Sequence, residues 1–379
     1  MRTKRIKILE AIRQGKIGGG ETHVLELVSK IDKSVFEPVV LCFTSGPMVE
    51  QLQKQGIEVH VIETERGFDW RIWNKVRRFM QEQQFDIVHA HGTRANSNVF
   101  WAAKKLNLPL IYTVHGWSFH PDQKPIIRYM RELSEKFLTS ISTSTICVSN
   151  SNQNDGIMRF NMKRSSVIYN GINTKKFDPN SEHKDIRKEL GILEEMTLIG
   201  FIVRLTLQKD PFTLIKAMKI VVEQTNDVVL LIVGEGDLKK QSIELVKELN
   251  LGSHIIFENF RQDVPDILNA IDIYCLPSLW EGLPIGILEA MSMGKVVIAT
   301  PIDGTSEIIS NHENGILIPI RDPLKLAEAI MSVHHNTMVQ KKLSVNAINT
   351  IHEKFDIDTM VEKIENYYTK ILSTNENRN

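Results

Sequence analysis

Short apolar runs rich in β-branched residues alternate with helical patterns along the whole chain, and this alternation constrains the fold most. Near-continuous apolar strands joined by helical crossovers are typical of parallel sheets covered on both faces. Two series of such strands predict an α/β protein with two doubly wound Rossmann-like domains facing across a cleft. The first series is expected at residues 6–12, 38–43, 57–62, 85–90, 109–115, 144–149 and 165–170. The second is expected at residues 197–203, 228–233, 254–259, 272–277, 295–300 and 315–320.

The polar segment 170–185 is the predicted domain boundary. It divides an N-terminal domain, residues 1–170, from a C-terminal domain, residues 171–355. Residues 356–379 are expected to form a helix that packs back on the N-terminal domain, followed by a disordered tail of sequence STNENRN. That helix is expected to begin near Thr359, where Glu362 would complete a capping box. Its predicted apolar face consists of Met360, Val361, Ile364, Tyr367, Tyr368 and Ile371.

The composition narrows the location and the partners of the protein. The 379 residues include 46 basic and 46 acidic side chains, so the formal net charge of zero disfavours a nucleic-acid binder. The three cysteines lie far apart in apolar runs, which fits a reducing compartment without disulfides. We see no signal-peptide pattern and no apolar stretch long enough to span a bilayer. The sequence therefore predicts a cytoplasmic protein that is at most peripheral to the inner face of the cell membrane.

Arg204 and Lys209 follow the strand predicted at residues 197–203 and precede a helix that Pro211 is suited to open. Two cations beside a helix N-terminus form an anion site, and a diphosphate fits it. Two solvated surface cations are an equally weighted interpretation of this loop alone.

The segment 276–295 places Glu281 before a helix that Pro284 would open, and Glu289 about one turn inside it. A carboxylate on the helix can accept hydrogen bonds from ribose hydroxyls, and one in the preceding loop can hold a second sugar. Gly282 and Gly286 would allow close approach of a ligand to the backbone. Acids complementing the helix dipole would explain Glu281, but Glu289 lies too far inside the helix.

Several segments, in this order, resemble glycosyltransferase family 4 over nearly the whole chain. The two glutamates lie in PSLWEGLPIGILEAMSMGKVVIAT, which resembles the donor-site signature of the family. The other segments are IGGGETH (17–23), VIYNGINTKKFDP (167–179), GFIVRLTLQKD (200–210), VGEGDL (233–238) and NGILI (314–318). The resemblance implies a GT-B fold and transfer of a sugar from a nucleotide donor with retention of anomeric configuration.

The resemblance also implies roles for individual residues. Arg204 and Lys209 would neutralise the donor diphosphate, Glu289 would bind the ribose and Glu281 would lie beside the transferred sugar. His115 would meet the sugar near its reacting face, and Gly19 and Gly20 would approach the diphosphate from the opposite domain. The remaining donor-binding positions would be Gly234, Gly282, Leu283, Pro284 and Ile285. Val203 departs from the family, which usually has glycine before the arginine.

We therefore expect a retaining hexosyl- or N-acetylhexosaminyltransferase that acts on a glycan or polyprenyl-linked acceptor in cell-surface polysaccharide biosynthesis. UDP is the expected nucleotide of the donor, with GDP second. Because the two cations can stabilise the leaving diphosphate, no metal or other cofactor is expected. The D-x-D pair of Asp356 and Asp358 precedes the terminal helix, where capping is the preferred role. A sugar-nucleotide epimerase and a non-catalytic nucleotide-sugar binding protein stay open as alternatives, and a periplasmic binding protein is disfavoured.

Two further groups of side chains, the clustered histidines and two basic segments, each have two possible roles. Among the clustered histidines His89, His91, His115 and His120, a zinc site is disfavoured because no cysteine or H-E-x-x-H helix accompanies them. Structural and acceptor-site roles for His91 are evenly weighted. The basic segments 67–83 and 124–136 are interpreted first as solvated helix faces and second as a contact with anionic membrane. In the first segment, Arg71, Lys75 and Arg78 would share one helix face.

Overall fold

The structure is a computed structural model that describes residues 5–15, 18–120 and 122–376. The chain divides into two compact units, one made of Met1–Gly171 with Ile357–Asn379 and the other of Ile172–Asp356. Each predicted strand overlaps one observed strand, and every strand pair is parallel. The α/β class with two doubly wound sheets is therefore confirmed.

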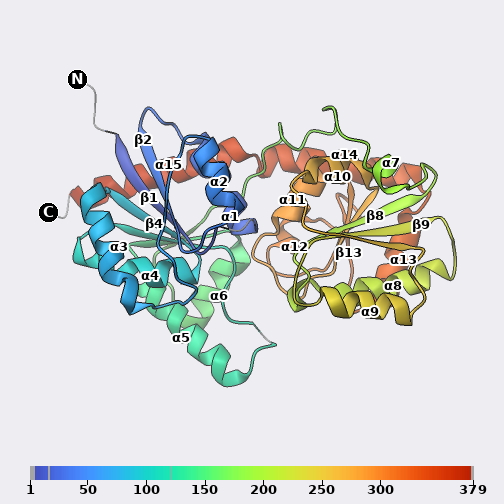
Figure 1. Ribbon diagram of the computed structural model, residues 1–379, viewed down its shortest axis with the longest axis horizontal. Helices are drawn as coiled ribbons and strands as arrows, with labels where there is room; N and C mark the ends of the chain where they lie inside the picture. The colour runs from blue at the N-terminus through green and yellow to red at the C-terminus, as the bar shows by residue number, and fades with distance from the viewer. Residues whose placement is uncertain (1–4, 16–17, 121, 377–379) are drawn as a thin grey trace. The chain divides into compact units, whose positions relative to one another are not determined.

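The first unit holds a seven-stranded sheet in the order β3-β2-β1-β4-β5-β6-β7. Its strands are β1 (Ile6–Ile12), β2 (Phe36–Cys42), β3 (Glu58–Val61), β4 (Ile87–His91), β5 (Leu110–Val114), β6 (Ser144–Cys147) and β7 (Ser165–Val167) (Figure 1). Its helices are α1 (Gly19–Lys30), α2 (Pro47–Lys54), α3 (Trp70–Gln83), α4 (Thr93–Lys105), α5 (Pro125–Ile141), α6 (Asn150–Phe160) and α15 (Ile357–Glu376).

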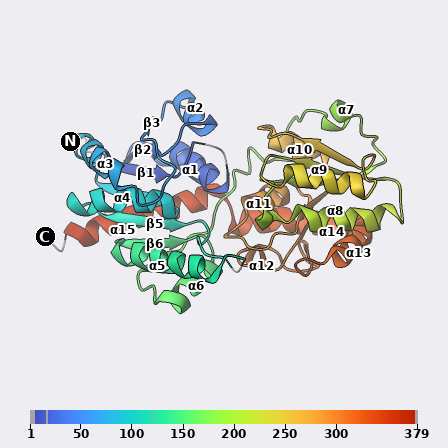
Figure 2. The same ribbon diagram turned by 60° about the horizontal axis from the view of Figure 1, so that its bottom comes forward.

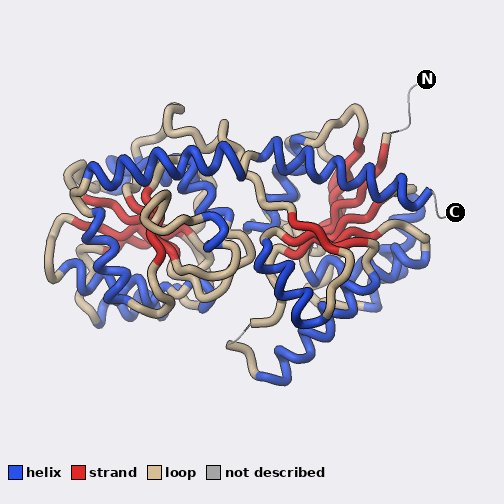
Figure 3. The backbone as a smooth tube through the Cα atoms, turned by 180° about the vertical axis from the view of Figure 1, so that it is seen from behind, coloured by secondary structure: helices blue, strands red, loops and turns tan. Residues whose placement is uncertain are grey.

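Both faces of this sheet are buried, which explains why its strands are apolar at nearly every position. Successive strand residues point to opposite faces. Ile8 packs with side chains of α1 and α15, whereas the next residue, Leu9, packs with those of α3 and α4. Burial of each such side chain contributes about 1.5–3 kcal/mol. Figure 3 shows the strands of each unit enclosed between helices.

The second unit holds a six-stranded sheet in the order β10-β9-β8-β11-β12-β13. Its strands are β8 (Thr197–Ile202), β9 (Val228–Val233), β10 (Ile255–Glu258), β11 (Ile273–Leu276), β12 (Val296–Ala299) and β13 (Ile316–Leu317). Its helices are α7 (Ile186–Leu190), the 3₁₀ helix η1 (Leu207–Lys209), α8 (Pro211–Val222), α9 (Lys239–Glu248), α10 (Val264–Ala270), α11 (Ile285–Ser292), α12 (Thr305–Ile308), α13 (Pro323–Val333) and α14 (Thr337–Lys354) (Figure 2).

The terminal helix differs from its prediction at both ends. Helix α15 begins at Ile357, two residues before Thr359, so the predicted capping box is wrong. Asp358 lies in the first turn and pairs with Lys30 on α1 at 2.5 Å. The segment expected to be disordered is helical as far as Glu376, and residues 377–379 lie outside the described part. The apolar face is as predicted, because its residues pack on the core of the first unit.

Candidate active site

Each sheet has one point where its strand order reverses, and ligands of open α/β sheets bind beside that point at the carboxyl ends of the strands. In the second unit the order reverses between the neighbours β8 and β11. The loop after β8 carries Arg204 and Lys209, and the loop after β11 carries Glu281. The topology therefore gathers three predicted donor-site residues at one edge of this sheet.

Lys209 and Glu281 are in direct contact through the lysine ammonium and the carboxylate. The carboxylate also accepts hydrogen bonds from the Ser278 hydroxyl at 2.7 Å and the Gln208 amide at 3.3 Å. The backbone N–H of Glu281 donates to Asp303 at 2.9 Å. Glu281 is only 8% exposed. Four residues therefore bond to Glu281, and the Lys209 ammonium is its counter-ion.

Arg204 lies on the same loop but is exposed. Its guanidinium makes no hydrogen bond or ion pair with any residue in the described part of the chain. Val203, the departure from the family pattern, has no positive φ, and its N–H donates to the Val233 carbonyl at 3.0 Å. Valine therefore fits this position, and the role of Arg204 at a diphosphate stays a prediction.

Helix α11 begins at Ile285 with Pro284 as its N-cap, and no side chain caps it. Its first turn therefore presents backbone N–H groups at the same sheet edge. Glu289 lies one turn inside the helix and is half-buried. Burial, together with the charges of Glu289 and Glu281, raises the pKa of Tyr274 on β11. Both predicted carboxylates thus lie within electrostatic range of one buried hydroxyl.

The N-terminus of α8, which was expected to form part of an anion site, is capped by a side chain of the protein. Asp210 caps this helix, and its carboxylate accepts from the Thr213 N–H at 3.2 Å and from the Thr213 hydroxyl at 2.6 Å. Pro211 occupies the first helical turn, as predicted. The chain's own acid therefore occupies the anion-binding end of α8, whereas α11 has no such side-chain cap.

Two glycines, Gly286 and Gly234, are required by contacts within the second unit. A Cβ atom at Gly286 would lie 2.5 Å from the Tyr274 hydroxyl oxygen, so the glycine is required by packing within the unit. Gly234 has φ of 141°, and a Cβ there would lie 2.0 Å from the Val203 carbonyl oxygen. Packing against Tyr274 is therefore sufficient to explain Gly286, and the close approach of a ligand to its backbone stays a prediction. A role for Gly234 beside a nucleotide stays a prediction.

In the first unit the strand order reverses between β1 and β4, where buried histidines and an acid meet. His91 Nε2 lies 2.8 Å from Glu10 Oε2, and His91 Nδ1 lies 3.1 Å from His115 Nε2. Tyr368 of α15 donates to the other Glu10 oxygen at 2.7 Å. His89 bonds to the Tyr368 hydroxyl at 2.6 Å. Glu10 therefore anchors a connected network that ends at the predicted site residue His115.

Helix α1 lies against the end of this network. A Cβ atom at Gly20 would lie 3.4 Å from His115 Cδ2, which brings together two predicted site residues. Gly19, also predicted, is exposed at the first residue of the helix. Ile17, in the same glycine-rich motif, lies outside the described residues. The ring of His23 meets that of His115 edge-on, with centroids 4.9 Å apart.

Burial decides the protonation of this network. It lowers the pKa of His91 to about 4 and that of His23 to about 3, with neighbouring histidines adding to the effect. Burial and the same neighbours lower the pKa of His115 well below its usual range. Burial alone would raise the pKa of Glu10, but the charges and hydrogen bonds of His89 and His91 outweigh it and lower that pKa. At neutral pH the imidazoles of His23, His91 and His115 are therefore neutral, and the Glu10 carboxylate is ionised.

Sequence reasoning missed Glu10, His23 and Asn170, which bonds to His23 at 3.0 Å. A glutamate inside the apolar run IKILEAI was a usable signal for Glu10. His120, which the sequence grouped with the other histidines, belongs to none of the clusters with metal-ligating geometry among the described residues. Those clusters are His23–His91–His115, Glu10–His89–His91 and Asp227–His334–His335.

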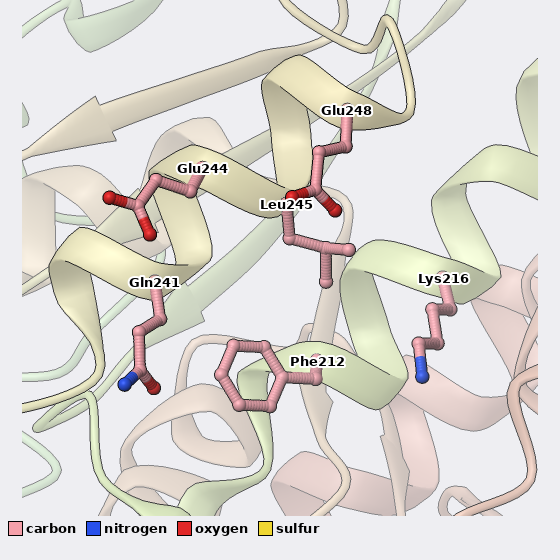
Figure 4. A pocket seen from close by; sticks show the side chains of 6 residues that line it. All are labelled: Phe212, Lys216, Gln241, Glu244, Leu245 and Glu248. Atoms are coloured by element: carbon pink, nitrogen blue, oxygen red, sulfur yellow. The ribbon is translucent and has the colours of Figure 1, made fainter.

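A hollow of about 330 Å³ lies between α8 and α9 (Figure 4). Leu245 and Phe212 point into it, and exposed polar side chains surround them. None of the predicted site residues lines it. The hollow therefore lies between two helices, whereas the predicted site residues lie at the carboxyl ends of the strands.

The fold and the switch-point residues define a glycosyltransferase of the GT-B type. Residues 17–176 match the family described as Glycosyltransferase Family 4, and residues 182–350 match the family described as Glycosyl transferases group 1. The chain belongs to glycosyltransferase family 4.

Three known proteins illustrate the similarity. The UDP-Gal:alpha-D-GlcNAc-diphosphoundecaprenol alpha-1,3-galactosyltransferase of Escherichia coli is 28% identical, over 97% of this chain and 98% of the relative. The N-acetyl-alpha-D-glucosaminyl L-malate synthase of Bacillus anthracis is 24% identical, over 82% of this chain and 81% of the relative. The crystal structure of Anabaena Alr3699/HepE in complex with UDP and glucose shares the fold, with a TM-score of 0.87 at 23% identity over 97% of this chain and 100% of that one.

Proposed function

We propose that the protein is a retaining hexosyl- or N-acetylhexosaminyltransferase that moves a sugar from UDP to a glycan or lipid-linked acceptor in cell-surface polysaccharide biosynthesis. The contact of Lys209 with Glu281 at the β8/β11 switch point carries this proposal. It joins a group that can stabilise a leaving diphosphate to one that can orient the transferred sugar. The relatives support it, because their names specify a UDP-galactose donor with a lipid diphosphate acceptor, and an N-acetylglucosaminyl product.

In the proposed donor complex, Lys209 and Arg204 neutralise the diphosphate, and Glu289 binds the ribose. Backbone groups of Gly282, Leu283, Pro284 and Ile285 line the start of α11, and Gly234 lies on the nucleotide side. Because Glu281 already engages Lys209, a donor phosphate would share that ammonium with the carboxylate. Each charge-assisted hydrogen bond of this kind contributes about 1.5–3 kcal/mol.

The proposed reaction separates charge rather than forming a bond to the enzyme. As the sugar–phosphate bond breaks, positive charge develops on the sugar and negative charge on the diphosphate, which the two cations stabilise. The leaving phosphate oxygen takes the proton of the acceptor hydroxyl, and that hydroxyl attacks the same face of the sugar. Retention from an α-linked donor gives an α-linked product, the linkage named for the Escherichia coli relative. No metal takes part in this proposal.

A screen of nucleotide sugars tests the proposal. Purified protein is incubated with UDP- and GDP-sugars and a lipid-diphosphate acceptor, and the product anomer is determined by NMR. We expect transfer from a UDP-sugar, an α-linked product and activity that persists in EDTA. An altered sugar nucleotide without acceptor would indicate an epimerase. Binding without turnover would indicate a non-catalytic protein, and a trapped sugar–enzyme adduct during turnover would refute the mechanism.

We also propose that α5 attaches the first unit to anionic membrane, where lipid-linked acceptors reside. On α3 the basic residues are exposed, but the apolar face packs into the core, which suits an ordinary solvated helix. Helix α5 instead exposes apolar side chains between Lys124, Arg131 and Lys136. These side chains are Ile126, Ile127, Tyr129, Met130, Leu133 and Phe137. In the described part of the chain, no helix is long and apolar enough to cross a bilayer.

Liposome flotation distinguishes the contribution of α5 to membrane binding from that of α3. Replacing Ile126 and Met130 with serine should abolish flotation with anionic vesicles, whereas Arg71→Glu, Lys75→Glu and Arg78→Glu on α3 should weaken it only slightly. Met338→Ser, on α14 and 82% exposed, is the matched control. If the α3 variant loses flotation and the α5 variant does not, the assignment to α5 is wrong.

A further inference from the structure

The buried network of the first unit has enough defined contacts to assign its protons. Glu10 is ionised and can only accept, so the His91 nitrogen beside it, Nε2, is the one that carries hydrogen. A neutral imidazole has a single N–H, so His91 Nδ1 is an acceptor. His115 Nε2, 3.1 Å away, must then be the donor. This leaves His115 Nδ1 with a lone pair and no hydrogen.

That lone pair has no hydrogen-bond donor among the described residues. His115 Nδ1 is buried and has no hydrogen-bond partner among the described residues. The same is true of His23 Nε2, because His23 Nδ1 is bonded to the Asn170 carbonyl oxygen and therefore carries the hydrogen. Buried acceptors without a donor are unfavourable, so a donor beyond the described residues, such as a bound ligand, is expected to satisfy them.

We propose that Glu10 and His91 are positioning residues that fix the tautomer of His115, so that its Nδ1 accepts a hydrogen bond from a hydroxyl of a sugar substrate. Asn170 fixes His23 in the same way. This inference rests on the proposed sugar transfer, since it names the chemistry with which the first unit meets the sugar. The site selects a group that can donate a hydrogen, such as a hydroxyl, over a carboxylate that can only accept.

A metal ion is the competing occupant of these imidazoles. The ring nitrogens of His23, His91 and His115 lie within 4.8 Å of one another, and Glu10 and Asn170 hold outer nitrogens as metal-site partners do. However, the 3.1 Å spacing of His91 Nδ1 and His115 Nε2 is a hydrogen-bond distance, so each nitrogen already has a partner in the other. Hydrogen bonding therefore accounts for the inner contact without a metal.

Nitrogen NMR of protein labelled with ¹⁵N in its histidine rings tests the tautomer directly, without substrate. We expect His115 Nδ1 to be unprotonated in the wild type. His91→Leu removes the acceptor and should give a mixture of tautomers, whereas His91→Asn keeps an acceptor near the Nδ1 position and should restore much of the bias. Tyr368→Phe removes the hydrogen bond to the other Glu10 oxygen and should leave the His115 tautomer unchanged.

Kinetics then connect the tautomer to transfer. With the sugar nucleotide that the screen identifies, kcat/KM should fall about tenfold in His91→Leu, the loss expected for one hydrogen bond, and recover partly in His91→Asn. UDP affinity by calorimetry should not change, because UDP alone lacks the sugar. Equal losses in both variants with a restored tautomer would show a merely structural role and overturn the proposal.

Two outcomes separate this inference from the proposed function. If transfer occurs but His115 Nδ1 is protonated, or stoichiometric zinc accompanies the purified protein and its removal shifts the ring signals, the inference fails and the transferase stands. If the tautomer pattern holds but no nucleotide sugar is consumed, the proposed function fails, and with it the assignment of the acceptor nitrogens to a sugar.

Discussion

The switch points of the two sheets occupy the same place in the same topology and have opposite chemistry. At β8/β11, an ammonium and a carboxylate pair at a partly exposed edge, and the Arg204 guanidinium on the same loop has no partner among the described residues. At β1/β4, the Glu10 carboxylate is fully buried and bonds to His91, whose pKa is lowered by burial to about 4. The topology therefore sets where a site can form, and solvent access decides which protonation states can exist there.

This difference follows from desolvation. Burial disfavours the charged form of an imidazole, so it lowers the pKa of His91 and His23 even though the Glu10 charge acts in the opposite direction. Lys209, by contrast, keeps part of its side-chain surface in water beside Glu281. In the proposed function, the second unit accordingly binds the charged part of the donor, and the first unit binds an uncharged hydroxyl. Three sets of experiments test this comparison.

The largest expected effect comes from Glu281→Ala. It removes the group proposed to orient the sugar and releases Lys209 from its partner, so kcat/KM for transfer should fall about 10³-fold. The exposed Glu244 on α9, changed to alanine, is the control and should retain full activity. A loss below tenfold would show that the acid is only the counter-ion of Lys209.

Substitutions of the two cations, Lys209 and Arg204, should have different effects. Lys209→Met leaves the Glu281 carboxylate buried without its partner, so both Tm and kcat/KM should fall, the latter about 100-fold. Arg204→Met breaks no contact among the described residues, so it should weaken UDP binding about tenfold and leave Tm unchanged. Lys240→Met, 90% exposed, controls for loss of surface charge. Unchanged UDP affinity in the Arg204 variant would place that side chain outside the donor site.

The smallest effect concerns stability against pH. The pKa of His91 falls from 6.5 in the unfolded chain to about 4 on folding, and that of His23 to about 3. Below pH 6.5 the unfolded chain binds more protons than the native protein, so the native protein loses stability as the pH falls toward 4. Each histidine contributes at most about 1.4 kcal/mol per pH unit. Urea unfolding from pH 7 to 5 should show this slope, and His91→Asn should reduce it. An unchanged slope would mean that His91 is protonated in the native protein.

Much of the fold was readable from the chain because strand periodicity and burial on both faces are local properties. Residues 6–12 and 228–233 were predicted to the residue as β1 and β9. The site was readable in part, because the residues after a parallel strand must lie at its carboxyl edge. The contact of Lys209 with Glu281 was not, since the two are 72 positions apart and nothing local aligns their side chains. The start of α15 was missed because Ile357 extends the helix two residues before the expected cap.

The sequence by itself determined two parallel sheets, their strands and the residues at their carboxyl ends, because alternating periods and apolar runs act over a few neighbouring positions. Tertiary structure alone decided that Glu10 would meet His91 and Tyr368, and that burial would lower the pKa of His91 and His23. These outcomes depend on strand register and on exclusion of water, which arise only when distant segments pack together.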